Sequence, residues 1–241
     1  MRIAVISDVH ANAIALEAVI KYIEERHVDE WIFLGDLVMN GPRPQEAFHK
    51  LKELSPIAWI KGNTDSWFEE IGDDFKPSSE REELLYSLFL YTDKQLTVDE
   101  KAFLVSRPEK QLVEIEGMKI LCTHGSHRSM NEQIGLMTPT EKLEQLTKEI
   151  DAEILLCGHT HSPYYASLNG KKIINVGAVS LSFDGDTRAS FGILEINEEI
   201  ISYENHRVSY DIPRVIDMAK KSDFPQPEVF IKKLTLANPN L

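Results

Sequence analysis

Six short apolar runs, each stopping abruptly at glycine, aspartate, asparagine or histidine, constrain the fold of this chain more than any other feature. Short apolar runs bounded by turn-forming residues are typical of buried strands. Helical patterns follow several of them, and Asn12 is placed to cap the first helix. This alternation predicts βαβαβ units around a mainly parallel sheet. The runs are RIAVIS (2–7), WIFLGD (31–36), IAWIKGN (57–63), MKILCTHG (118–125), AEILLCGHTH (152–161) and KKIINVG (171–177).

The length of 241 residues favours one α/β domain over two very small ones. We expect a single domain over residues 1–241, with a helical insertion at about 66–110 and a C-terminal hairpin plus helix at about 190–241. Three capping boxes are predicted to begin helices, and each pairs Ser or Thr with a Glu three residues later. The pairs are Ser79 with Glu82, Thr97 with Glu100, and Thr138 with Glu141.

The net charge of −13 argues against binding of a long nucleic acid, which requires clustered lysine and arginine to neutralise phosphates. A small anion held through metal ions is still compatible with it. The sequence has neither a charge-free run long enough to cross a bilayer nor a signal-peptide pattern, so we expect a cytoplasmic protein without membrane contact. Cys122 and Cys157 lie in apolar runs and are predicted to be free, buried thiols.

Polar side chains gather where the predicted strands end. The carboxyl ends of strands in open α/β sheets meet at one crevice, so these side chains should converge there. Carboxylate, amide and imidazole ligands together suit Mn²⁺, Fe or Zn²⁺. Seven candidate ligands exceed the number that one ion needs. A bridging carboxylate would divide them between two ions about 3.5–4 Å apart. The candidate ligands are Asp8, His10, Asp36, Asn63, His124, His159 and His161.

The same residues, in this order and spacing, resemble the calcineurin-like metallophosphoesterase superfamily, and in particular its small prokaryotic phosphodiesterase branch. The motifs that carry the resemblance are SDVHAN, GDLVMNGPRP, GNTD, THG, GHTHSP and NVGAVS, and they span nearly all of residues 1–210. The resemblance implies an α/β fold in which two facing mixed sheets are flanked by helices, a four-layer α/β/β/α sandwich.

Carried over by position, the family pattern assigns each candidate ligand to one of two divalent ions. It implies that Asp8, His10 and His161 hold the first, that Asn63, His124 and His159 hold the second, and that Asp36 bridges them. A hydroxide between the ions would attack phosphorus. Mn²⁺ is the expected metal, with Fe, Zn²⁺, Ni²⁺ and Mg²⁺ as alternatives, and the branch resemblance points to a homodimer.

Three further residues are candidates for contact with the phosphate: Arg43, Thr64 and His127. Arg43 follows Asp36 in a proline-flanked loop, where an exposed loop arginine is the alternative. His127 and its neighbour Arg128 follow His124. Thr64 departs from the family, because many members have a histidine there that is often assigned as proton donor to the leaving group.

Without that histidine, the leaving oxygen must be protonated by Asp65, by His127 or by water, or the substrate must have a good leaving group. A requirement for a good leaving group favours aryl phosphodiesters and phosphoanhydrides such as dinucleoside polyphosphates. We therefore expect a dimetal-dependent phosphoesterase acting on small nucleotide-like phosphodiesters or phosphoanhydrides. The insertion carries aromatic residues that we expect to form its core, with stacking on a nucleobase as the alternative. They are Trp67, Phe68, Phe75, Tyr86, Phe89 and Tyr91.

Two other functions are compatible with parts of the sequence. Cys122 and Arg128 match the cysteine-x5-arginine spacing of cysteine-dependent phosphatases, in which a thiolate attacks phosphorus. A catalytically silent metal-binding scaffold is the non-enzymatic alternative, and the threonine at position 64 favours it. The complete set of ligands argues against it, since a scaffold does not need half-open metal sites.

Overall fold

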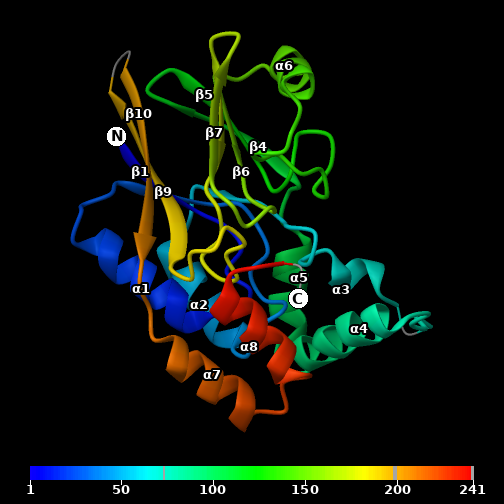
Figure 1. The fold of residues 1–241 in the computed structure, drawn as a ribbon. Coiled ribbons are helices and arrows are strands. Elements are labelled where there is room, and N and C mark those ends of the chain that lie inside the picture. The colour runs from blue at the N-terminus through cyan, green and yellow to red at the C-terminus, as the bar shows by residue number, and fades with distance from the viewer. Residues whose placement is uncertain (73, 198–199, 240–241) are drawn as a thin grey trace.

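The computed structural model describes residues 1–72, 74–197 and 200–239. Within them the chain forms two five-stranded sheets and the helices α1 to α8 (Figure 1). The helices are α1 (Ala13–Glu24), α2 (Pro44–Leu54), α3 (Trp67–Glu70), α4 (Glu80–Asp93), α5 (Val98–Val105), α6 (Thr140–Glu149), α7 (Ile212–Lys221) and α8 (Pro227–Leu236).

The first sheet combines the start of the chain with a hairpin near its end. Its strand order is β10-β9-β1-β2-β3. β1 pairs in parallel with β2 and β2 with β3, whereas β9 is antiparallel to both β1 and β10. The strands are β1 (Arg2–Ile6), β2 (Glu30–Phe33), β3 (Ala58–Trp59), β9 (Ala189–Asn197) and β10 (Ile200–Val208).

The second sheet has the order β4-β5-β6-β8-β7. β5, β6 and β8 run parallel, and the antiparallel strands β4 and β7 close its two edges. The expectation of a mainly parallel sheet is therefore wrong, and the two mixed sheets implied by the resemblance are confirmed. The strands are β4 (Lys110–Ile115), β5 (Met118–Thr123), β6 (Ile154–Cys157), β7 (Tyr164–Leu168) and β8 (Lys171–Asn175).

The side chains of β1 point alternately to its two faces, which explains why the first sheet lies between a helical layer and the second sheet. Successive side chains of a strand point to opposite faces. Ala4 and Ile6 pack with the apolar faces of α1 and α2, while Ile3 and Val5 pack against residues of β5, β6 and β8. On the far side of the second sheet, α6 packs against β6 and β8 through a third apolar cluster. The four layers are thus α1 and α2, the first sheet, the second sheet, and α6 (Figure 1).

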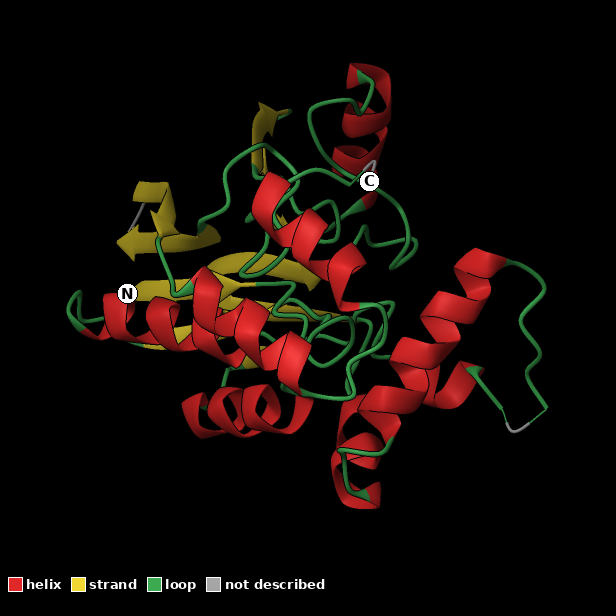
Figure 2. Ribbon diagram, turned by 60° about the horizontal axis from the view of Figure 1, so that its bottom comes forward, coloured by secondary structure: helices red, strands yellow, loops and turns green. Residues whose placement is uncertain are grey.

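The segment predicted as a helical insertion contains α3, α4 and α5, which project to one side of the sheets (Figure 2). Its aromatic residues mostly pack on one another, as expected of a cap core: Phe68 and Phe89 lie 5.7 Å apart between ring centroids, and Phe75 and Tyr86 lie 5.2 Å apart. Two of them differ: Trp67 lines the cavity described below, and Tyr91 packs on Phe224, between α7 and α8, with ring centroids 5.2 Å apart. The division of the chain into domains stays a prediction.

The three predicted capping boxes have three outcomes. Thr97 and Glu100 form the complete box at α5. At α4, Ser79 accepts from the backbone of Glu82, but the Glu82 carboxylate turns to Ser78. At α6 the prediction is wrong: the Thr138 hydroxyl accepts from Gly135 N, and the helix begins at Thr140 without a side-chain cap.

The C-terminal part contains the predicted hairpin, β9 with β10, and the predicted helix α7. A further helix, α8, was not predicted. It begins with Pro227, which suits a first helical position, and buries Phe230 and Leu234 against α7. Among the described residues, none of the helices is long and apolar enough to span a lipid bilayer.

Candidate metal centre

The seven candidate ligands follow strands from both sheets. Asp8 and His10 come after β1, Asp36 after β2 and Asn63 after β3, while His124 comes after β5 and His159 and His161 after β6. These parallel strands direct their carboxyl ends to one edge of the molecule. Residues from both halves of the chain therefore meet at one place.

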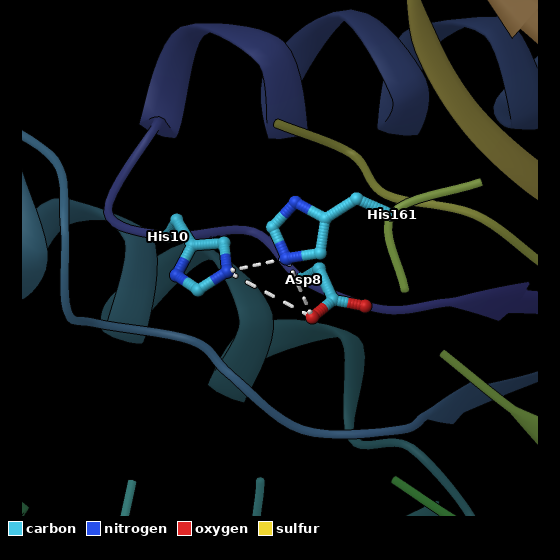
Figure 3. A group of neighbouring side chains, drawn as sticks. All are labelled: Asp8, His10 and His161. Carbon is cyan, nitrogen blue, oxygen red and sulfur yellow. Dashed lines mark hydrogen bonds and ion pairs between the residues drawn. The ribbon is translucent and has the colours of Figure 1, made fainter. Parts of the chain in front are cut away.

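Two groups of these side chains are close enough to share a cation. One is Asp8, His10 and His161 (Figure 3), and the other is Asp8, Asp36 and His124. Within each group the ligand atoms lie within 4.8 Å of one another. The Nε2 atoms of His10 and His161 are 3.0 Å apart. Two nitrogens that bind one ion at about 2.1 Å, with an angle of about 90° at the ion, are also about 3.0 Å apart.

Each of three imidazoles is oriented by a backbone carbonyl. The Nδ1 atom of His10 lies 3.1 Å from Met39 O, that of His124 lies 2.7 Å from Leu34 O, and that of His161 lies 2.6 Å from Leu181 O. A carbonyl can only accept, so Nδ1 carries the proton in each ring. The Nε2 lone pair is then free to bind metal, which is the usual arrangement behind a metal-binding histidine.

The Asp8 carboxylate faces these nitrogens. Its Oδ2 accepts from His159 N at 3.0 Å. Its Oδ1 is fully buried and has no hydrogen-bond partner among the described residues. This oxygen lies 3.3 Å from His161 Nε2, 3.8 Å from His10 Nε2 and 3.9 Å from His124 Nε2. A buried carboxylate oxygen without a partner is costly, and a cation among these nitrogens would satisfy it. The residues present therefore fit a metal ion.

Asn63 and His159 join the second group. Asn63 Oδ1 lies 3.1 Å from His124 Nε2, and the rings of His124 and His159 are 5.1 Å apart between centroids. All seven candidate ligands are thus in one cluster. Asp36 Oδ2 lies 3.7 Å from His10 Nε2 and 3.5 Å from His124 Nε2, so it stands between the two groups. Asp8 is the residue that belongs to both groups, and bridging by Asp36 stays a prediction.

The backbone at the cluster is strained. Five candidate ligands have left-handed φ values: Asp8 (55°), His10 (46°), Asp36 (61°), His159 (66°) and His161 (56°). This region costs an L-residue about 1–2 kcal/mol. Such outliers persist only where the surrounding structure imposes them, and they concentrate at functional sites.

Glycines directly precede three of the candidate ligands, Asp36, Asn63 and His159, because the strand ends nearly touch there. A Cβ at Gly158 would lie 2.0 Å from Ser7 Oγ and 2.6 Å from Asp8 Oδ2. A Cβ at Gly62 would lie 2.1 Å from Asp36 Oδ1. Only glycine allows the strand ends to approach this closely. The Gly-Asp, Gly-Asn and Gly-His pairs of the sequence are therefore packing requirements of the cluster.

Asp65, a candidate proton donor in the sequence, has a different environment. Its carboxylate is buried and accepts from the backbone N–H groups of Asp36, Leu37 and Gly62 at 2.8, 3.0 and 3.0 Å. Burial and the neighbouring Asp36 raise its pKa to about 6. It does not line the cavity, so the geometry makes it a positioning residue for the Asp36 turn.

Asn175 was missed as part of the centre. Its side-chain amide is buried and donates to Gly158 O at 2.7 Å, Ile134 O at 2.9 Å and Thr160 Oγ1 at 2.9 Å. It thereby holds the turn that carries His159 and His161. The signal available was its position as the last residue of β8, where the apolar run reaches a polar side chain.

Without a bound cation, the charged groups of the cluster perturb one another strongly. Burial raises the pKa of Asp8, but the imidazoles of His161 and His124 outweigh it and bring the pKa to about 2. Burial lowers the pKa of His124, but Asp36 and Asp8 raise it to about 10. Burial and the nearby His161 lower the pKa of His10 to about 4. The negative charges of Asp8 and Asp36 therefore keep His124 protonated. A divalent ion can take the place of that proton.

A cavity of about 320 Å³ opens onto the cluster. Six predicted residues line it, namely His10, Asp36, Asn63, Thr64, His159 and His161. Thr64 N donates to Asp36 Oδ1 at 2.8 Å, and the Thr64 hydroxyl is buried without a partner among the described residues. Thr64 is therefore placed at the mouth of the cluster, as a phosphate contact requires.

Arg43 and His127 are not brought to this cavity. Arg43 is exposed before α2 and lines a different cavity, together with Tyr91 and Lys94. His127 Nε2 is paired with the Glu149 carboxylate at 2.9 Å. Their predicted roles at the phosphate gain no support from the geometry.

The cysteine alternative fails on burial. Cys122 and Cys157 are free and buried, as predicted. Cys122 has no exposed surface, and burial raises the pKa of its thiol to about 12. Arg128 is bound to Glu149 through Nε and Nη2, each at 2.7 Å. A nucleophilic cysteine must be accessible and ionised, so this thiol is structural.

Comparison with known proteins agrees with the cluster. The family model described as the calcineurin-like phosphoesterase superfamily domain matches residues 1–199. A metallophosphoesterase of Sphaerobacter thermophilus has a similar structure, with a TM-score of 0.80, 29% identity and coverage of 98% of this chain and 99% of that one.

Two archaeal proteins are also similar over almost their whole length. An uncharacterized protein of Methanocaldococcus jannaschii is 27% identical over 93% of this chain and 94% of its own. A hypothetical protein of Pyrococcus horikoshii has the same fold, with a TM-score of 0.87, 21% identity and 98% coverage of each chain. The family match over most of the sequence and the clustered metal-ligand side chains lead to one conclusion: the chain belongs to the calcineurin-like phosphoesterase superfamily and is a metal-dependent phosphoester hydrolase.

Proposed function

We propose that this chain hydrolyses phosphodiester or phosphoanhydride bonds of small substrates, nucleotides among them, with two divalent ions. Asp8, His10 and His161 would hold one ion, Asn63, His124 and His159 the other, with Asp36 between them. Mn²⁺ is the proposed metal, and Fe, Zn²⁺, Ni²⁺ and Mg²⁺ are the alternatives. The observation that carries the proposal is the buried Asp8 Oδ1, which faces three Nε2 atoms without a hydrogen-bond partner among the described residues.

The bound ions would supply an activated water and neutralise the charge of the phosphate. The chain's own residues hold the other groups in place. Thr64 N fixes Asp36 Oδ1, which leaves Asp36 Oδ2 directed at His10 and His124. The Thr64 hydroxyl is free to donate to a phosphate oxygen at the cavity.

We expect the protein to prefer substrates with good leaving groups because few side chains at the cavity can donate a proton to the leaving oxygen. Among the described residues that line the cavity, every imidazole and every carboxyl group belongs to a candidate ligand. Asp65 is bound to three backbone N–H groups, and His127 is paired with Glu149. Among the described residues, no imidazole or carboxyl group outside the candidate ligands therefore lies at the cavity to protonate a leaving oxygen, so aryl esters and phosphoanhydrides should react faster than alkyl monoesters.

A series of aryl phosphodiesters with leaving groups of graded pKa tests this proposal. With added Mn²⁺, we expect kcat/KM to fall steeply as the leaving-group pKa rises, and chelator to abolish turnover. A rate independent of leaving-group pKa would show that an acid protonates the leaving oxygen. No turnover of any phosphoester with Mn²⁺, Ni²⁺, Mg²⁺, Fe²⁺ or Zn²⁺ would instead favour the metal-binding scaffold.

The cytoplasmic location and the homodimer stay predictions. Cell fractionation tests the first, and sedimentation of the purified protein tests the second.

A further inference from the structure

The cavity at the metal centre extends well beyond the candidate ligands. The helical insertion and the C-terminal helix, far apart in sequence, form its other walls. Leu181 and Phe183 link the two parts, and the ring of Phe183 stacks on His161 with centroids 4.5 Å apart. A substrate with its phosphate at the metals would place its remaining groups against α4 and α8.

One face of α4 lines this cavity with an apolar stripe that begins at a cation. Arg81, Leu84 and Leu88 are spaced by three and four residues, so they lie on the same side of the helix, and all three line the cavity. Leu88 is buried, whereas Arg81 at the first turn is exposed.

α8 also lines the cavity with apolar side chains and one cation. Val229, Phe230 and Lys233 share one face by the same spacing, and all three line the cavity. Phe230 and Leu88 are both buried and belong to one apolar cluster, together with Leu181 and Phe224. Lys233 is half-buried near the end of α8. Each helix therefore presents apolar side chains and one cation to the same space.

Neither of these two cations has a counter-ion among the described residues. Neither Arg81 nor Lys233 forms a salt bridge or a side-chain hydrogen bond with any residue in the described part of the chain. The absence is notable in a protein with 39 acidic residues and 26 lysines and arginines. Burial and the nearby charge of Arg81 lower the pKa of Lys233. Two like charges beside an apolar wall repel each other, and a bound anion would relieve that repulsion.

We propose that Arg81 and Lys233 bind a second phosphate of the substrate, adjacent to the one held at the metal centre. The apolar faces of α4 and α8 then take the organic part. The substrate class is a phosphoanhydride with an aromatic or apolar group, of which a nucleoside polyphosphate is the representative. A cavity of about 320 Å³ is at the small end of the range for ligand pockets, so it suits one nucleoside rather than two. This inference rests on the proposed function.

Competition between ADP and AMP tests the subsite, because the two differ by one phosphate. Hydrolysis of bis(4-nitrophenyl) phosphate is the readout, at a fixed concentration of free Mn²⁺. The inhibition constant of ADP should be at least about tenfold lower than that of AMP. In the R81M/K233M variant the two constants should become equal within about threefold.

Lys232→Met is the matched control, since Lys232 is an exposed neighbour on α8 that does not line the cavity. It should keep the wild-type ratio, and each single variant should lose part of it. The inference is overturned if the wild-type protein does not distinguish ADP from AMP, or if the double variant, with an unchanged melting temperature, still does. Absence of diester hydrolysis would count against the proposed function alone, because calorimetric titration with ADP and AMP still measures the ratio.

Discussion

His10 Nε2 lies 3.0 Å from His161 Nε2, although 151 residues separate them in the sequence (Figure 3). Each ring has its Nδ1 at a backbone carbonyl, so two lone pairs face each other across this distance. Such a contact is unfavourable unless a cation or a proton lies between the rings. The metal centre is thus visible in the protein geometry, and the predictions below depend on it.

Replacement of Asp36 by alanine should impair both metal binding and hydrolysis. Asp36 Oδ2 stands between His10 and His124, so the substitution removes the carboxylate that would bridge the two ions. We expect fewer than two Mn²⁺ per chain and a fall in kcat/KM of at least about 100-fold. Metal analysis and diester hydrolysis measure these, with the surface variant Asp217→Ala as control. A variant with normal metal content and turnover would refute the bridging role.

Gly158→Ala should disrupt the turn that carries His159 and His161. The new Cβ would overlap Ser7 Oγ and the Asp8 carboxylate, and backbone must shift to relieve the overlap. We expect a loss of about 1–3 kcal/mol in the free energy of unfolding, together with weaker Mn²⁺ binding. Gly135→Ala is the control, because its Cβ would make an ordinary contact with Thr160 at 3.7 Å. Equal effects of both substitutions would contradict the packing argument.

Asp65→Ala should act through stability and metal affinity rather than through proton transfer. It leaves three buried N–H groups of the Asp36 turn without an acceptor, which should cost about 2–4 kcal/mol of folding free energy. Asp65→Asn, which keeps an acceptor oxygen, should recover part of the loss. The dependence of kcat/KM on leaving-group pKa should be the same in both variants and the wild type. A steeper dependence in either variant would identify Asp65 as the acid.

Chelator and iodoacetamide should have opposite effects. The Cys122 thiol is fully buried with a pKa of about 12, so at pH 8 the native protein should resist alkylation and keep its activity. Chelator should abolish turnover, and added Mn²⁺ should restore it. Cys122→Ala should remain active. Inactivation by iodoacetamide before the protein unfolds would reinstate the cysteine mechanism.

Metal binding should release protons, and its affinity should fall as the pH falls. In the metal-free protein the pKa of His124 is raised to about 10, so this imidazole is protonated at pH 7. An ion binds the neutral ring, and each proton displaced weakens binding by up to about tenfold for each unit of lower pH. Calorimetry in buffers of different ionisation enthalpy should detect at least one proton released per chain at pH 7. Binding without proton release would contradict the ligand assignment of His124.

The site was more predictable from the sequence than the sheets were. Each candidate ligand follows an apolar run, and the ends of parallel strands must meet, so the clustering of Asp8 with His161 could be expected from pattern alone. The pairing of β9 with β1 could not, because it joins Arg2 to Glu195 and leaves no local trace in either segment. Mixed sheets were therefore implied only by the resemblance.

Tertiary packing also explains the other differences. The Thr138 hydroxyl satisfies the N–H of Gly135 instead of capping α6, a competition between two local partners that spacing does not decide. Asp65 follows Asn63 and Thr64 closely and looks like a site residue, yet it turns inward to the backbone. Arg81 and Lys233 carry no motif, and only the tertiary fold, which places α4 and α8 around one cavity, brings them together.

Anomalous scattering from crystals grown with Mn²⁺ tests the metal centre most directly. Two peaks are predicted, one among Asp8, His10 and His161 and one among Asn63, His124 and His159, with the Asp36 carboxylate between them. Density for manganese only at the protein surface, or none at all, would contradict the account.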